Sequence, residues 1–132
     1  MDVERLMHLP LFGELDHHDL SKLARWVGEV DEPAGTLLIE QGSRPSEMFV
    51  IEQGTAEVLR DGERIAEVGP GDVVGEMGPI KLQRRMASVR TTSPLRAVTL
   101  GAEGLASIDR EMPEVGGQLR REIARREAED ST

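Results

Sequence analysis

Short β-type runs alternate with glycine- and proline-containing turns from Gly28 to about Leu100, and this pattern restricts the fold more than any other feature. The runs are TLLIE, EMFVIE, TAEVLR, ERIAEV, DVVG, RMASVRT and LRAVTL, and they recur about every ten residues. Strands at this spacing are typical of an antiparallel sandwich or barrel. RDGE, at residues 60–63, is the clearest hairpin, because Asp-Gly tolerates the positive φ angles of a two-residue turn.

Helical patterns lie on both sides of this β region. Residues 2–8 indicate a short helix, and residues 17–27 an amphipathic helix with Asp16 as its N-cap. After the strands, AEGLASID indicates another short helix. The sequence therefore predicts one domain with three parts, which are N-terminal helices at 1–27, a β-roll at 28–101 and C-terminal helices at 102–132.

The last predicted helix begins at Pro113 and Glu114. Its apolar positions include Leu119 and Ile123, with Ala124 as a further candidate, so its apolar stripe is thin. Glycine disfavours helix, and two glycines stand near the start. This helix is therefore expected to depend on tertiary contacts and to move. Its arginines are expected on solvated faces, namely Arg120, Arg121, Arg125 and Arg126.

The amino-acid composition argues against several classes of binding partner. The 132 residues include 16 basic and 25 acidic ones, so the formal net charge is −9. Duplex binding and docking on anionic membranes both depend on clustered Lys and Arg, so neither nucleic acid nor a membrane is an expected partner. No apolar run approaches the roughly 20 residues of a membrane span. Cysteine is absent, which excludes disulfides and thiolate chemistry and fits a cytoplasmic protein.

The stretch GDVVGEMGPIKLQRRMASV, residues 71–89, places Glu76 in a glycine-rich loop and Arg85 before a strand-like run. A guanidinium suits phosphate oxygens and does not deprotonate. GPIKL can form one helical turn with its proline first, and the N–H groups of that turn would then face an anion. Glycine at 75 and 78 lets the backbone approach closely. We interpret the stretch as a cradle for a sugar-phosphate ring. A structural ion pair between Glu76 and Arg85 is the alternative.

Period-two alternation divides the run after the loop into two faces, one with Arg85, Ala87 and Val89 and the other with Arg84, Met86 and Ser88. The apolar set belongs inside. Arg85 is therefore expected to point inward and Arg84 into solvent.

These stretches resemble the cyclic nucleotide-binding domain family. LPLFGELDHHDLSKLA is similar to its opening helices, EPAGTLLIEQGSRPSEMFVIEQGTAEVL to its first strands, and GPGDVVGEMGPI with RRMASVRT to its phosphate-binding cassette. The resemblance implies a mainly β fold, an eight-stranded antiparallel jelly roll with N-terminal helices and a C-terminal lid helix at about 114–127.

The resemblance also implies a ligand site. Matched by motif, Glu76 binds the ribose 2′-hydroxyl and Arg85 binds the cyclic phosphate. The other residues of the implied site are Gly75, Met77, Gly78, Met86 and Ala87. Met86 stands where the family usually carries Ala, Ser or Thr. In the family a hydroxyl at this position helps to hold guanine, and Met86 has none, so cyclic AMP is the expected ligand rather than cyclic GMP.

The function expected from this resemblance is a regulatory domain that binds cyclic AMP and transmits its occupancy through helix movement. No cofactor is expected, and the protein partner is an effector or an output domain, while a homodimer stays open. The alternative is an interaction module of the same fold that binds no nucleotide, an idea that Met86 keeps open. Catalysis is not expected, because the loop has no nucleophile–base pair. A cupin metal site is disfavoured because its His ligands lie on strands, and His8, His17 and His18 all precede them.

Overall fold

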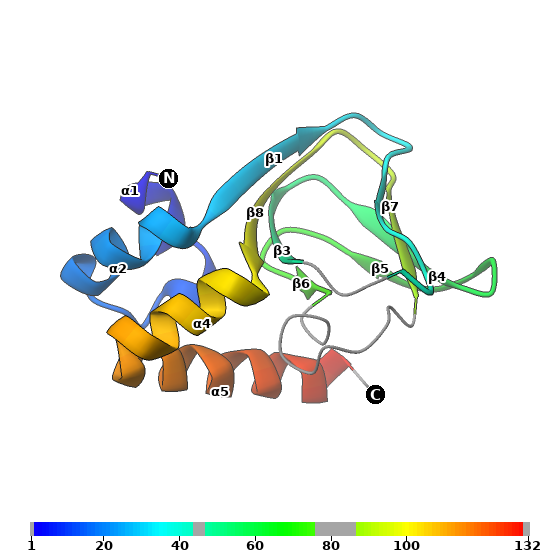
Figure 1. Ribbon diagram of the computed structural model, residues 1–132. Helices are drawn as coiled ribbons and strands as arrows, with labels where there is room; N and C mark the ends of the chain where they lie inside the picture. The colour runs from blue at the N-terminus through cyan, green and yellow to red at the C-terminus, as the bar shows by residue number, and fades with distance from the viewer. Residues whose placement is uncertain (1, 44–46, 76–86, 131–132) are drawn as a thin grey trace.

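The computed structural model describes residues 2–43, 47–75 and 87–130, with side chains described as far as Arg125. A helical layer lies beside a β-roll, and both ends of the chain contribute to that layer (Figure 1). At its N-terminal end the chain forms four short helical elements, which are α1 (Val3–Met7), η1 (Pro10–Phe12), α2 (His17–Leu23) and η2 (Ala24–Trp26). The amphipathic helix predicted at 17–27 is thus an α-helix followed by a 3₁₀ turn.

Two aspartates begin the N-terminal α-helices. The Asp16 carboxylate accepts a hydrogen bond from the Asp19 N–H at 2.8 Å, and the Asp2 carboxylate accepts one from the Glu4 N–H at 2.9 Å. Such caps satisfy N–H groups that have no partner in the first turn of a helix. The predicted N-cap at Asp16 is confirmed.

Eight strands form two four-stranded sheets in which every pair is antiparallel, with the orders β1-β8-β3-β6 and β2-β7-β4-β5. This confirms the predicted eight-stranded antiparallel roll with flanking helices, and the sheets do not close into a barrel. The strands are β1 (Gly28–Glu32), β2 (Leu37–Ile39), β3 (Glu47–Gln53), β4 (Ala56–Arg60), β5 (Glu63–Val68), β6 (Val73–Val74), β7 (Ser88–Thr91) and β8 (Leu95–Gly101).

The hairpin predicted at RDGE is also confirmed. Its two central residues, Asp61 and Gly62, have φ angles of 54° and 82°. Positive φ at both central positions gives the turn a twist that matches the flanking strands, which are β4 and β5.

The chain ends in two helices, α4 (Ala102–Glu111) and α5 (Pro113–Asp130). The apolar stripe of α5 is longer than predicted, since Val115 is buried together with Leu119 and Ile123. Ala124 is exposed, so its assignment to the stripe was wrong. Successive helical residues are about 100° apart, and a residue next to Ile123 therefore points away from the core.

Two apolar cores lie on opposite sides of the β1-β8-β3-β6 sheet. β8 contributes to both, because its side chains alternate between the faces of the sheet. Val98 and Leu100 pack with the helices, whereas Leu95 and Ala97 face the interior of the roll. The roll core contains Ile39, Phe49, Ile51, Ala56, Val74, Val89, Leu95 and Ala97.

An ion-pair cluster fastens α1 to the outer face of this sheet. The Arg5 guanidinium donates to the Glu52 carboxylate on β3 at 3.1 and 2.5 Å and also pairs with Glu29 on β1. The hydrogen bond to Glu52 raises the pKa of Arg5 above its ordinary value. Within the part of the chain that the structure describes, no helix has the length and hydropathy needed to span a membrane.

Candidate functional site

The loop that holds the predicted site begins at a well-anchored turn. The Asp72 carboxylate accepts a hydrogen bond from the Gly69 N–H at 2.8 Å, and the Ile51 N–H donates to the Asp72 carbonyl at 3.0 Å. β6 follows with two buried valines and pairs with β3. Gly75 comes next with a φ of 76°, a left-handed angle that glycine adopts without strain. The chain therefore enters the loop from a fixed position and in a direction that favours glycine.

The loop ends at β7, in the other sheet. β7 lies between β2 and β4, so it is held on both sides. Val89 and Thr91 are buried while Arg90 between them is exposed, which matches the predicted alternation. Ala87 is half-buried just before the strand. Segment 75–87 thus joins the two sheets, and its ends adjoin the roll core through Val74 and Val89.

Two of the seven predicted site residues, Gly75 and Ala87, are among the described residues, one at each end of this segment. The others lie outside the described residues, namely Glu76, Met77, Gly78, Arg85 and Met86. Their roles as ligand-binding residues therefore stay predictions.

Sequence reasoning missed two residues that position the segment. Asp72 was placed only at the start of the predicted run DVVG, although an aspartate after Pro-Gly can also accept a hydrogen bond from a backbone N–H of the preceding turn. Ser88 was assigned to the outer face, where its hydroxyl accepts a hydrogen bond from the Gln41 N–H at 2.9 Å. This bond ties the start of β7 to the segment after β2, and no local pattern predicts it, because the partners are 47 positions apart.

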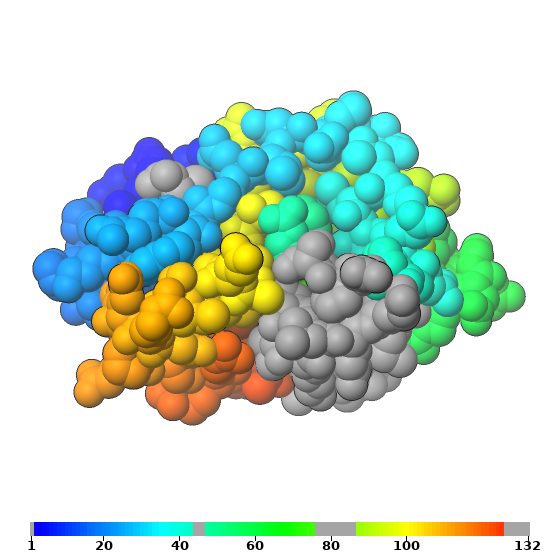
Figure 2. Space-filling view, viewed as in Figure 1, coloured from blue at the N-terminus to red at the C-terminus, as the bar shows by residue number. Residues whose placement is uncertain are grey.

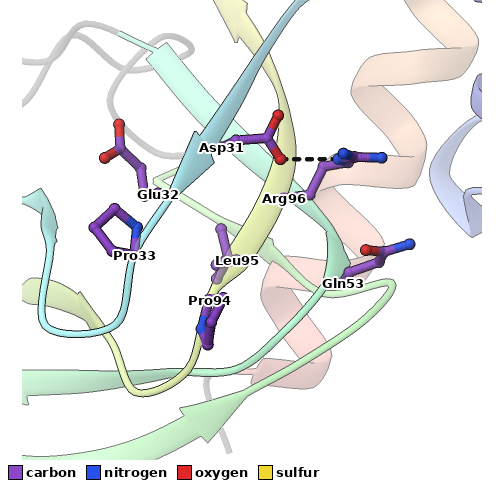
Figure 3. A pocket seen from close by; sticks show the side chains of 7 residues that line it. All are labelled: Asp31, Glu32, Pro33, Gln53, Pro94, Leu95 and Arg96. Atoms are coloured by element: carbon purple, nitrogen blue, oxygen red, sulfur yellow. Dashed lines mark hydrogen bonds and ion pairs between the residues drawn. The ribbon is translucent and has the colours of Figure 1, made fainter.

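A cavity of about 350 Å³ lies at other strand ends, where β1 and β3 finish and β8 begins (Figure 3). Its lining residues are Asp31, Glu32, Pro33, Gln53, Pro94, Leu95 and Arg96. Arg96 donates to the Asp31 carboxylate at 2.8 Å, and this bond raises the pKa of Arg96. Two carboxylates against one paired guanidinium give this cavity a negative balance. It does not suit a phosphate, so we do not assign it to the nucleotide.

No three side chains of the His, Asp or Glu type come together as a metal site within the described ranges. His17 and His18 are both exposed on α2. Both are therefore surface residues of the N-terminal helices.

The sequence model of the cyclic nucleotide-binding domain family matches residues 29–111, which are more than half of the chain. The chain therefore belongs to the cyclic nucleotide-binding domain family. The match covers the strands and α4, and it includes the whole segment between β6 and β7.

Relatives agree with this family. The Pycsar effector protein XpPycTIR of Xanthomonas perforans is 38% identical over 105 residues, which are 78% of this chain and 35% of that protein. The cAMP-dependent protein kinase regulatory subunit of Yarrowia lipolytica is 32% identical over 102 residues, which are 75% of this chain and 27% of that protein. The chain thus spans roughly a quarter to a third of these two curated relatives.

A solved structure shows the same fold. The cyclic nucleotide-binding domain from Methylobacillus flagellatus superposes with a TM-score of 0.86 at 22% identity, covering 97% of this chain and 75% of that one. At this sequence identity the comparison supports the fold alone.

Proposed function

We propose that this chain is a regulatory domain that binds cyclic AMP at segment 75–87. The observation that carries the proposal is that this segment connects β6 and β7, whose Val74 and Val89 belong to the roll core, in a chain of this family. In the proposed site, Glu76 accepts a hydrogen bond from the ribose 2′-hydroxyl and Arg85 pairs with the cyclic phosphate. The backbone of Gly75, Met77 and Gly78 lines the sugar-phosphate ring, and Met86 and Ala87 complete the site.

The net negative charge of the protein supports the proposal that the site contains a positively charged side chain. A cyclic nucleotide is a monoanion, and a protein with a net charge of −9 repels it at long range. Binding then requires a local cation that outweighs this repulsion, and a guanidinium offers two parallel donors to phosphate oxygens. Arg85 is the cation that the motif supplies. Met86 has no hydroxyl to hold guanine, which favours cyclic AMP over cyclic GMP.

A titration of the purified protein with cyclic AMP tests this proposal. A ligand that binds only the folded state stabilises it, by about 2.7 kcal/mol at a hundred times its Kd. Cyclic AMP should therefore release heat in calorimetry and raise the Tm, and cyclic GMP should do so at higher concentration. If millimolar cyclic AMP gives neither heat nor a thermal shift, the proposal fails and the interaction module without nucleotide takes its place.

We propose that the domain transmits its nucleotide occupancy to a partner protein or to an attached domain. The two relatives are named an effector and a kinase regulatory subunit, which supports regulation of another activity. The C-terminal helix is the proposed moving part. Its first turns are anchored, because Val115, Leu119 and Ile123 are buried in the helical core. We therefore narrow the proposed lid from 114–127 to the turns of α5 after Ile123.

Hydrogen exchange tests the lid. Amides of α5 after Ile123 should exchange quickly in the free protein and slowly with saturating cyclic AMP, because closure over the base protects them. Amides from Val115 to Ile123 should be slow in both states and serve as the internal control. If segment 75–87 responds to the nucleotide and the end of α5 does not, the helix is not the lid.

A further inference from the structure

The joint between α4 and α5 carries an inference that rests on the proposed function. We infer that Asp109, Gly116 and Arg120 are positioning residues for nucleotide binding. They set the angle between the two helices and thereby the place of the last turns of α5. None of the three is proposed to touch the ligand.

Gly116 allows a close approach of the two helices. It is buried, and a Cβ atom added to it would lie 2.3 Å from the Asp109 carboxylate oxygen Oδ1 and 3.1 Å from the Asp109 Cα. The carboxylate could rotate away, but the Cα belongs to the backbone of α4. A side chain at position 116 would therefore turn the Asp109 carboxylate aside and shift α5 from α4 by a few tenths of an ångström, so the observed separation favours glycine.

An ion pair fixes the rotation of α5 at this close approach. The Arg120 guanidinium donates to the Asp109 carboxylate oxygen Oδ2 from Nε at 2.9 Å and from Nη2 at 2.5 Å. Arg120 lies one turn after Gly116, on the same face of the helix. Arg120 was expected on a solvated face, and its side chain is partly exposed there, but the fold also brings Asp109 beside it. Both side chains remain more than a third exposed, so the pair orients the helix rather than holding it strongly.

The link between the helices is short, and contacts between the helix surfaces act together with it to set their angle. Met112 is the single residue between α4 and α5, and Pro113 begins the second helix. The Met112 N–H donates to the Ile108 carbonyl at 2.7 Å, and the Gly116 N–H donates to the Met112 carbonyl at 2.9 Å. Beyond this link the surfaces of α4 and α5 meet, as the neighbouring yellow-orange and orange-red regions in Figure 2 show.

A small rotation of α5 at the joint with α4 produces a large displacement at the end of α5. Asp130 lies 14 residues after Gly116, or about 21 Å along the helix, so a rotation of about 10° moves it by about 4 Å. The end of α5 extends past α4 toward the roll (Figure 1). A displacement of this size would separate a lid from its ligand.

The first test compares two neighbouring glycines. Gly116→Ala should displace α5, whereas Gly117→Ala should not, because among the described residues a Cβ at 117 meets only the flexible end of Arg121, at 3.3 Å. Both changes remove a helix-weakening glycine, so they differ mainly in the contact. The chain has no cysteine, so spin labels at Ala124→Cys and Glu63→Cys report one distance between α5 and the roll. We expect Gly116→Ala to shift or broaden that distance and Gly117→Ala to leave it unchanged.

The second test measures cyclic AMP affinity in the same variants. Gly116→Ala should weaken binding about tenfold through steric displacement. Asp109→Asn and Arg120→Gln should each weaken it about two- to fivefold. Arg121→Gln, an exposed control, should have no effect, and the exchange Asp109→Arg with Arg120→Asp should restore part of the loss. Dissociation of a fluorescent cyclic AMP analogue should be faster in each weakened variant.

The outcomes separate this inference from the proposed function. If the wild-type protein binds no cyclic AMP, the proposed function fails, and the label distances still test the joint. If the wild-type protein binds and the two glycine variants match it in both distance and affinity, the inference is overturned. Circular dichroism checks folding, and if Gly116→Ala does not fold, Asp109→Asn and Arg120→Gln carry the test.

Discussion

Replacing Arg85 with alanine should abolish most cyclic AMP binding while the protein still folds. Removing one partner of a buried, hydrogen-bonded charge pair typically costs about 2–5 kcal/mol, which corresponds to a loss of affinity of about 30-fold or more. The fold should survive, because the apolar residues that form the roll core all lie in strands outside segment 75–87. Calorimetric titration measures the affinity, and urea unfolding checks the stability.

Arg84→Ala is the matched control, since it removes the same side chain one position earlier. In β7, Val89 and Thr91 point inward and Arg90 points outward. If this alternation continues toward the loop, Arg85 shares the inward face and Arg84 the outward one. Arg84→Ala should therefore change the affinity by much less. A larger loss in Arg84→Ala than in Arg85→Ala would mean that the register changes before β7.

Replacing Gly54 with alanine should destabilise the fold more than the same change at another turn glycine. Gly54 connects β3 to β4 with a φ of 91°, and an added Cβ would lie 2.2 Å from the Pro94 carbonyl oxygen and 2.8 Å from the Leu95 Cα. Both contacts are with backbone, so no side-chain rotation relieves them. The left-handed angle and the steric overlap together should cost about 2–5 kcal/mol in the free energy of unfolding.

Gly35→Ala separates the two causes. Gly35 has a φ of 85°, but no atom of the described residues lies within 4 Å of its added Cβ. Its replacement should cost only the strain of the left-handed angle, about 1–2 kcal/mol. Urea unfolding followed by the fluorescence of Trp26, the single tryptophan, measures both variants. Equal losses at the two positions would show that the turns can separate at little cost.

Features that depend on neighbours in sequence could be predicted from the chain alone. The Asp16 cap, the Asp61–Gly62 hairpin turn and the alternation in β7 all follow from local rules of backbone geometry and side-chain period. The β-rich fold class followed from the spacing of strands and turns. The residues of the proposed nucleotide site came from a motif within one short segment, and five of the seven lie outside the described residues, so their roles stay predictions.

Features that depend on contacts between distant segments were decided only by the tertiary structure. Arg120 belongs to a polar helix face by its sequence, yet it pairs with Asp109 because the helices fold back at Met112. Gly54 and Gly35 are alike as turn glycines, but only Gly54 lies against another turn, which is far away in the chain. A local pattern determines which conformations a residue can adopt. Which atoms it meets depends on how the sheets and helices pack, and that packing is absent from any single stretch of sequence.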